Sequence, residues 1–208
     1  MTFKEKILLE SKAWALEKQS FDNQYFKDLT RRPKTAMLWI DSTDNLVPVR
    51  ELTNTDPGEI LVHRNHGSQV RADDISLMAS LEHAVEISGA QFIVVCGYSH
   101  CSGVRDVIQG NDSKPHLNKW LEQLHEMYEH NSGKMERLSS RQKEKLLCEL
   151  NIQRQIINLS KLDIVQSAWE SGKKLTLLGW YFDLSKGSIQ EIFAMEARDL
   201  LMQVSPVE

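Results

Sequence analysis

The sequence predicts an α/β fold in which helices flank a mostly parallel central sheet. Three observations support this fold class. Short apolar runs recur along the chain, as expected of strands that are buried on both faces. Segments with the apolar period of a helix lie between these runs. A strand, a helix and a second strand at this spacing form a βαβ unit, whose crossover makes the two strands parallel.

The first expected element is an amphipathic helix over residues 3–18. Thr2 followed by Glu5 predicts a capping box, and apolar residues recur from Ile7 to Leu16 at roughly helical spacing. We expect the apolar stripe of this helix to dock on a neighbouring surface.

The core is expected to contain four strands at apolar runs, and a helix over residues 73–89 between the second and third. An aspartate precedes the apolar positions of that helix and Gly89 follows them, as at helix ends. The four runs are "TAMLWI" (35–40), "EILVH" (59–63), "QFIVVC" (91–96) and "KLTLLGWYF" (174–182).

Further helices are expected after the third strand. "SGVRDVIQG" begins one directly after Cys101, and residues 116–130 and 139–171 have helical patterns. A turn at 184–188 then leads to a last strand, "SIQEIF".

Length and composition bound the class of protein. With 208 residues, of which 41% are hydrophobic, the chain can bury one core. We expect a single domain over residues 1–208, with a helical arm at 1–34 and an α/β core at 35–208. The net charge of -4 gives no electrostatic support for a nucleic-acid or anionic-membrane partner.

The expected location is cytoplasmic. Charged residues interrupt the apolar positions at the N-terminus, and no apolar run is long enough to cross a bilayer. In a reducing compartment, Cys96, Cys101 and Cys148 are not expected to form a disulfide framework. Cys96 and Cys148 are expected in the core.

Two loops carry the functional expectation. Ligands of parallel sheets gather beyond the carboxyl ends of the strands. "DSTDNLVP" follows the first strand and "GYSHCSG" follows the third, so we expect the site between these loops.

These two loops, together with the segment from residue 147 to residue 187, resemble the β-carbonic anhydrases of the proteobacterial type. The resemblance rests on "LWIDSTDNLVPVRELTNTDPGEILVHRN", on "VVCGYSHCSGV" and on "LCELNIQRQIINL" followed by "VQSAWESGKKLTLLGWYFDLSKG". It covers nearly the whole chain in order and spacing. It implies a mostly parallel sheet, exchanged N-terminal helices and an obligate dimer or a tetramer.

The resemblance also identifies positions at which this chain departs from the family. The family holds zinc with Cys-x-Asp-x-Arg and His-x-x-Cys loops, and the matching residues here are Ser42, Asp44, Leu46, Tyr98 and Cys101. Serine and tyrosine hydroxyls are neutral at pH 7 and are poor zinc ligands beside thiolate and imidazole. We therefore expect no zinc cofactor and no hydration of carbon dioxide by a zinc-bound hydroxide.

Two enzymatic alternatives stay open at this point. His100, with Asp41 and Cys101, could rebuild a metal site. Cys101 could instead act as a nucleophile, since the following helix would favour its thiolate, with Tyr98 and Asp44 as proton donor and acceptor.

A second group of residues points to anion binding. In one subgroup of the family a tryptophan, an arginine and a tyrosine bind bicarbonate, and the resemblance assigns these roles to Trp39, Arg64 and Tyr181. Arg64 could clamp a carboxylate or bicarbonate. Asp41 could equally occupy this arginine as an internal ion pair.

The loop after "HRN" adds His66 and Ser68, which we expect to make the mouth of the pocket polar. The sequence favours a homologue without zinc-dependent hydration that acts in binding or regulation. A small anion or an active homologue is the candidate partner, besides further copies of the chain.

Overall fold

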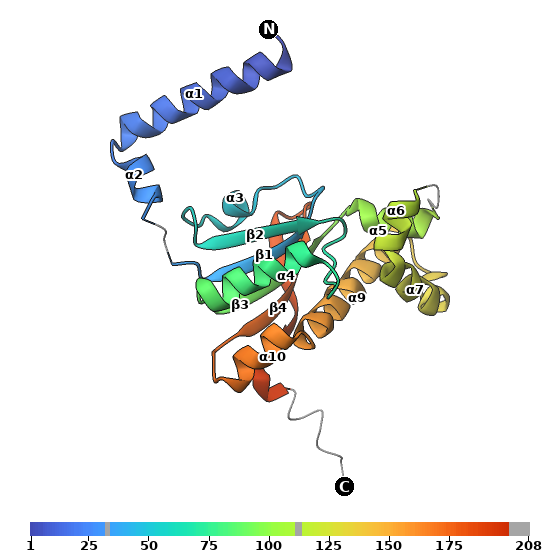
Figure 1. The fold of residues 1–208 in the computed structure, drawn as a ribbon. Helices are drawn as coiled ribbons and strands as arrows, with labels where there is room; N and C mark the ends of the chain where they lie inside the picture. Colours follow the sequence, from blue (N-terminus) through green and yellow to red (C-terminus); the bar gives the residue numbers. More distant parts are fainter. Residues whose placement is uncertain (32–33, 111–113, 200–208) are drawn as a thin grey trace.

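A computed structural model describes residues 1–31, 34–110 and 114–199 of this chain. Its core is a five-stranded sheet flanked by helices, and an N-terminal helix stands apart from that core (Figure 1). The expected α/β class with a mostly parallel sheet is confirmed.

The five expected strands all form, and most extend past the predicted ends. The sheet has the order β2-β1-β3-β4-β5, in which the first four strands are parallel and β5 runs antiparallel to β4. Because β1 and β3 each end two residues later than expected, Ser42 and Tyr98 are the last residues of strands rather than loop residues. The strands are β1 (Met37–Ser42), β2 (Ile60–Asn65), β3 (Phe92–Tyr98), β4 (Thr176–Asp183) and β5 (Ser188–Met195).

The helices lie in the expected regions, but the long ones are interrupted. The predicted helix at 139–171 breaks at Leu162, whose extended backbone (φ -73°, ψ 136°) cannot continue a helix. The helices are α1 (Phe3–Phe21), α2 (Tyr25–Leu29), α3 (Val49–Thr53), α4 (Ile75–Glu82), the π-helix η1 (His83–Ile87), α5 (Ser102–Gln109), α6 (Pro115–Trp120), α7 (Glu122–His130), α8 (Ser132–Met135), α9 (Ser140–Ser160) and α10 (Asp163–Glu170).

The core consists of two hydrophobic clusters. One joins residues of the sheet to α4, α10 and the C-terminal half of α9, and includes Leu77, Ile156 and Trp169. The other includes Cys96 and Cys148, which are both buried as expected, together with residues of α5 and α7.

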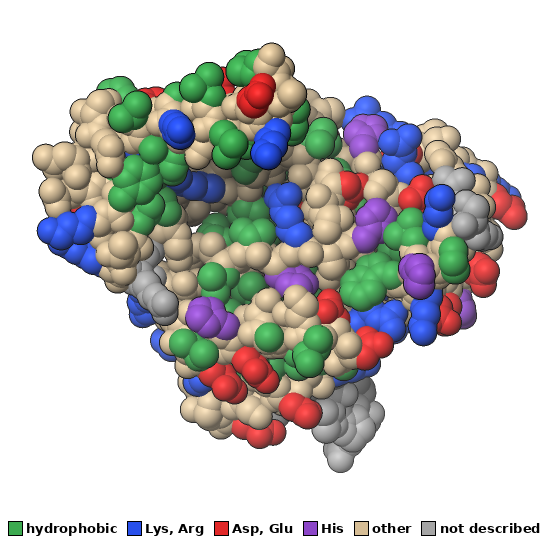
Figure 2. Space-filling model, turned by 45° about the horizontal axis from the view of Figure 1, so that its top comes forward, with side chains coloured by type: hydrophobic (Ala, Val, Ile, Leu, Met, Phe, Trp, Pro, Cys, Tyr) green, Lys and Arg blue, Asp and Glu red, His purple; other side chains and the backbone are tan. Residues whose placement is uncertain are grey.

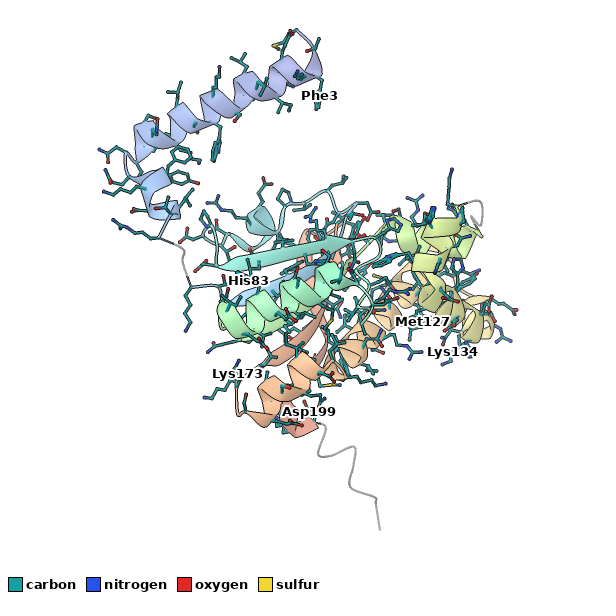
Figure 3. The ribbon with its side chains drawn as sticks, in the orientation of Figure 1. Phe3, His83, Met127, Lys134, Lys173 and Asp199 are labelled. Atoms are coloured by element: carbon teal, nitrogen blue, oxygen red, sulfur yellow. The ribbon has the colours of Figure 1, made fainter. Side chains whose placement is uncertain are left out.

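The arm helix α1 has the predicted capping box between Thr2 and Glu5, but none of its residues is buried. Figure 3 shows α1, with Phe3 at its start, standing apart from the core, and Figure 2 shows hydrophobic side chains along the arm above a hollow. The expected docking of its stripe stays a prediction. The exposed hydrophobic residues of α1 are Phe3, Ile7, Leu8, Leu9, Trp14, Leu16 and Phe21.

In the part of the chain that the structure describes, no helix combines the length and the apolar content that a membrane crossing requires.

Two glycines let α9 pack directly on the backbone of the sheet. A Cβ atom at Gly97 of β3 would lie 2.5 Å from Cys148 Sγ, and one at Gly179 of β4 would lie 2.6 Å from Ile152 Cγ2. Real side chains cannot approach this closely, so any larger residue would push α9 away from the strand ends.

We expect Gly97→Ala to lower the free energy of unfolding by about 1–3 kcal/mol, because the added methyl group overpacks the contact with α9. Urea denaturation followed by tryptophan fluorescence measures this change. Gly133→Ala in α8 is the control, since a Cβ atom there meets no heavy atom within 4 Å. Equal stability of the two variants would contradict the close approach of α9.

Candidate functional site

The candidate site lies where β1 and β3, which are neighbours in the sheet, end side by side. Residues 43–48 follow β1 and residues 99–101 follow β3, so the parallel arrangement brings Asp44 and Cys101 together. This is the location expected from the sequence.

Asp44 is the centre of the polar contacts in this site. Its carboxylate accepts hydrogen bonds from the hydroxyl of Ser102, from the backbone N–H of Ser102 at 2.8 Å, and from the Ser42 and Tyr98 hydroxyls. Burial alone would raise the pKa of Asp44, but these hydrogen bonds together outweigh it and lower the pKa to about 2. Asp44 is therefore an ionised carboxylate surrounded by neutral donors.

Ser42 links three chain segments at this point. Its hydroxyl donates to Asp44, and its oxygen accepts the backbone N–H of Gly67 at 3.1 Å. Cys101 Sγ lies 3.8 Å from the same oxygen. The hydroxyl thus holds the loop after β2 against the ends of β1 and β3.

Cys101 lies at the N-cap of α5, as expected, but its burial opposes the thiolate that one of the enzymatic alternatives requires. Burial raises the pKa of Cys101 to about 11, although backbone hydrogen bonds from Val104 and Gly103 oppose this. A buried thiol surrounded by little water is not ionised by the helix terminus alone. At neutral pH Cys101 is a protonated thiol and a weak nucleophile.

Tyr98 is equally unsuited to donate or lose a proton readily. Burial raises the pKa of its phenol, and the hydrogen bond to ionised Asp44 raises it further. Tyr98 therefore acts as a neutral hydrogen-bond donor.

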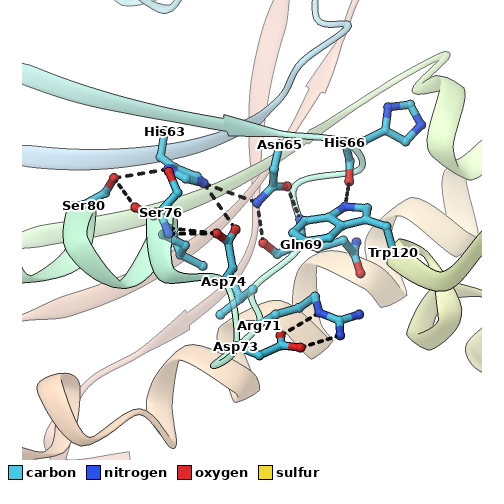
Figure 4. A network of polar contacts seen from close by, with 12 residues as sticks. His63, Asn65, His66, Gln69, Arg71, Asp73, Asp74, Ser76, Ser80 and Trp120 are labelled. Atoms are coloured by element: carbon cyan, nitrogen blue, oxygen red, sulfur yellow. Dashed lines mark hydrogen bonds and ion pairs between the residues drawn. The ribbon is translucent and has the colours of Figure 1, made fainter. Parts of the chain in front are cut away.

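A network of buried amides positions the loop after β2 (Figure 4). Asn65 and Gln69 exchange hydrogen bonds of 2.7 Å, and Gln69 Nε2 donates to the carbonyl of Gly67 at 2.7 Å and to Asn151 of α9 at 2.9 Å. Asn151 donates to the same carbonyl at 3.0 Å. This network orients the Gly67 N–H toward Ser42.

His63 forms a serine–histidine–aspartate arrangement that is structural. Its Nδ1 lies 3.2 Å from Ser80 Oγ, and its Nε2 lies 3.8 Å from Asp74 Oδ2. Ser80 donates its own proton to the carbonyl of Ser76 at 2.9 Å, so Nδ1 must donate to Ser80 and cannot act as its base. Burial also lowers the pKa of His63, which favours the neutral ring.

His66 and Ser68 make the pocket mouth less polar than expected. Ser68 is buried and donates to the carbonyl of Cys96 at 3.0 Å. The backbone carbonyl of His66 accepts a hydrogen bond from the indole N–H of Trp120 at 2.7 Å (Figure 4). The ring nitrogen Nε2 of His66 is buried and has no hydrogen-bond partner among the described residues. A Cβ atom at Gly103 would lie 3.3 Å from this nitrogen.

Asp41 and Arg64 form the internal ion pair that was one expected alternative. Arg64 Nη2 lies 3.2 Å from Asp41 Oδ2, and Arg64 Nη1 donates to the carbonyl of Asn45 at 3.2 Å. Asp41 also accepts from the Asn45 amide and from the backbone N–H of Ser42. Burial raises the pKa of Asp41 despite these partners. Leu46, the next residue of the loop, is 85% exposed.

The structure does not bring the three expected anion-binding residues together. Trp39 packs edge-on against Trp180 with ring centroids 5.4 Å apart, whereas the adjacent Tyr181 points to the opposite face of the sheet. Lys145 of α9 lies over the Tyr181 ring at 5.7 Å. The grouping of Tyr181 with Trp39 and Arg64 is therefore wrong, because neighbouring residues of a strand alternate between faces.

His100, the replacement ligand in one of the open alternatives, has a different partner. Its backbone is left-handed (φ 70°), and its Nδ1 lies 3.6 Å from Glu144 Oε2 of α9, which also pairs with Arg105 at 3.8 Å. Across residues 1–31, 34–110 and 114–199, no three histidine, cysteine or acidic side chains gather as a metal would require.

Comparisons with known proteins agree with this geometry. Residues 37–189 match the protein family described as "Carbonic anhydrase". A carbonic anhydrase of Pseudomonas aeruginosa is 31% identical over 189 residues, which cover 88% of this chain and 85% of that protein. One of Emericella nidulans is 29% identical over 189 residues, which cover 90% of this chain and 82% of that protein.

Solved structures are similar over nearly the whole chain. A tetrameric β-carbonic anhydrase of Sordaria macrospora superimposes with a TM-score of 0.86 at 26% identity, covering 92% of this chain and 98% of that one. The β-carbonic anhydrase of Coccomyxa in complex with acetazolamide gives a TM-score of 0.85 at 27% identity, with 94% and 89% covered.

We expect Asp44→Asn to lower the free energy of unfolding at pH 7 by about 1–2 kcal/mol, because the charge strengthens the hydrogen bonds that Asp44 accepts in a partly exposed site. The folded-state pKa is lower than the ordinary value, so this stabilisation is present above about pH 4 and is lost as the pH falls toward 2. The difference between the variant and the unchanged protein should shrink over that window in urea titrations.

Asp56→Asn provides the control for this measurement, since Asp56 is exposed. A loss for Asp44→Asn that is as large near pH 2 as at pH 7 would refute the role of its charge.

Proposed function

We propose that this chain, which belongs to the carbonic anhydrase family and to its β class, does not hydrate carbon dioxide with a zinc-bound hydroxide. It acts instead as a binding or regulatory member of the family. The observation that carries the proposal is that the residues around Asp44 form hydrogen bonds with one another.

The residues at the zinc-ligand positions of the family are satisfied by one another. Asp44 accepts from Ser42, Tyr98 and the backbone of Ser102, and Cys101 packs on the Ser42 oxygen. These contacts link the ends of β1 and β3, which a metal bound to both loops would also link. The site is thus held together by hydrogen bonds.

The chemistry of the donors does not fit zinc. A zinc site in proteins takes thiolate, imidazole and carboxylate ligands. Here two of the four positions are a serine hydroxyl and a tyrosine phenol, and the thiol of Cys101 has a pKa of about 11. Only the carboxylate of Asp44 is already ionised, and a cation there would have to displace its hydrogen bonds.

Both enzymatic alternatives have weaker support. A nucleophilic Cys101 needs a thiolate, and burial opposes its formation. A metal site rebuilt around His100 needs its imidazole beside Cys101, whereas that ring pairs with Glu144 at 3.6 Å. Anion binding at Arg64 would have to displace the internal carboxylate of Asp41.

Self-association is part of the proposal. The tetrameric Sordaria protein is similar over nearly the whole chain, and α1 carries hydrophobic residues that stay exposed in one chain. A second copy that covers this helix would bury the apolar surface. We therefore propose a dimer or tetramer that uses the arm.

Zinc content and hydration activity test the proposed loss of metal chemistry. We expect the purified protein to hold far less than one zinc per chain by mass spectrometry and to show no hydration above background in a stopped-flow assay. Ser42→Cys combined with Tyr98→His restores two sulfur ligands and one imidazole, and should raise the zinc content strongly.

The control combines Ser42→Cys with Ser99→His, which adds the same groups but places the imidazole one residue away. Ser99 lies beside β4, where its hydroxyl accepts the Leu184 N–H at 2.9 Å. Near-stoichiometric zinc with hydration activity in the unchanged protein would overturn the proposal.

The arm is tested by two charges on its exposed face. Leu9 and Leu16 are 58% and 69% exposed, so Leu9→Glu with Leu16→Glu should leave the fold of one chain intact. We expect the variant to shift to smaller species in analytical ultracentrifugation, because buried charges oppose assembly. Lys12→Glu is the control at an already polar position, and an unchanged mass of the double variant would exclude the arm as an interface.

A further inference from the structure

A cavity of about 290 Å³ lies on the α9 side of the sheet, beside the ends of β3 and β4. Its rim carries Arg141 and Lys145 from the first turns of α9, and Lys186 from the turn between β4 and β5. All three side chains are exposed. Two elements therefore direct positive charge to one opening, and the N-terminus of α9 adds to this potential.

The floor of the cavity consists of neutral side chains. Tyr98, Cys101 and Tyr181 are buried there, and Val104 of α5 adds an apolar surface. The Tyr181 hydroxyl is hydrogen-bonded to the side chain of Ser99. A ligand in this cavity would meet cations at the rim and an uncharged, partly aromatic surface below.

The two acidic side chains that line the cavity are engaged with other groups. Glu144 pairs with His100 at 3.6 Å and with Arg105 at 3.8 Å. Asp183 accepts from the backbone and hydroxyl of Ser185 at 3.0 and 2.6 Å.

The cations are held less tightly. Arg141 donates one of its five N–H groups to Ser185 Oγ at 2.9 Å, and Lys186 lies 3.8 Å from Asp183. Lys145 lies 2.8 Å from Glu149 and over the ring of Tyr181. Because exposed ion pairs of lysine are weak, these side chains can turn toward an anion at little cost.

We propose that this cavity binds a small oxyanion, a carboxylate or a phosphate, between Arg141, Lys145 and Lys186. A planar guanidinium on the rim can hold two oxygens of such a group. A volume of about 290 Å³ is at the lower end of ligand pockets, which favours a small molecule. A short apolar body attached to the anionic group would contact Val104 and the Tyr181 ring.

This proposal rests on the proposed function, because it names the class of ligand for the proposed binding role. It also gives Tyr181 a place in anion binding different from the one predicted with Trp39 and Arg64. The two proposals fail separately, because binding at the rim of α9 requires no particular chemistry at Ser42. Zinc in the protein would overturn the first and leave the second standing.

Thermal denaturation and calorimetry of the full chain test this site. Potassium acetate, benzoate and phosphate are titrated separately, with chloride keeping the ionic strength constant. We expect a saturable rise in melting temperature with at least one of them. Arg141→Gln combined with Lys145→Gln should weaken the binding by about tenfold or more, since charge-assisted hydrogen bonds are lost.

Two variants provide matched controls. Lys143→Gln removes the same charge from the same helix outside the cavity, and Arg64→Gln removes the arginine of the predicted anion site. Both should keep the anion-dependent rise.

Three results would overturn the proposal. They are the absence of a saturable rise with all three anions, an equal loss in Lys143→Gln, and a loss in Arg64→Gln alone. A response to phosphate and not to the carboxylates, or the reverse, identifies the class of ligand. Arg141, Lys145 and Arg64 are exposed and Lys143 is half-buried, and melting without anion checks that the variants are folded.

Discussion

The ionised carboxylate of Asp44 is the interaction on which the arrangement of the strand ends depends. Parallel strands bring their carboxyl ends together, and the loops that follow need a common partner to stay in place. Asp44 supplies it by accepting hydrogen bonds from the end of β1, the end of β3 and the start of α5. The amide network around Gln69 then joins the loop after β2 to the same point through Gly67 and Ser42.

The polar groups beside this centre are satisfied in pairs, which leaves few free to meet a ligand. Asp41 neutralises Arg64, Ser68 donates to the backbone of β3, and Glu144 pairs with His100. Burial then has a consistent effect, because it keeps the Cys101 thiol and the Tyr98 phenol protonated. The cavity on the α9 side differs, since its cations lie at an exposed rim.

The fold class could be predicted from the sequence because the strands are short apolar runs. The segments "HRN" and "CSG" also match the pattern of a known family. The sequence also indicated that Asp44 and Cys101 follow neighbouring strands, and it offered the Asp41–Arg64 ion pair, which the structure contains, as one of two alternatives. It could not give the ionisation of Cys101, which depends on burial by residues far away in the chain. The face of the sheet to which Tyr181 points depends on the strand register, because a shift of one residue moves a side chain to the opposite face. The break at Leu162 follows tertiary packing that the helical period does not report.

The uncovered arm has a consequence for how the protein is made. The helix α1 precedes the core in the chain, so during synthesis it emerges before any strand of the sheet has formed. Its capping box lets it form locally, yet none of its side chains is buried by its own chain. Until it meets a partner, each new chain exposes a hydrophobic helix to chaperones and proteases. If a second copy covers the arm, as proposed, unassembled chains would be cleared sooner than assembled ones.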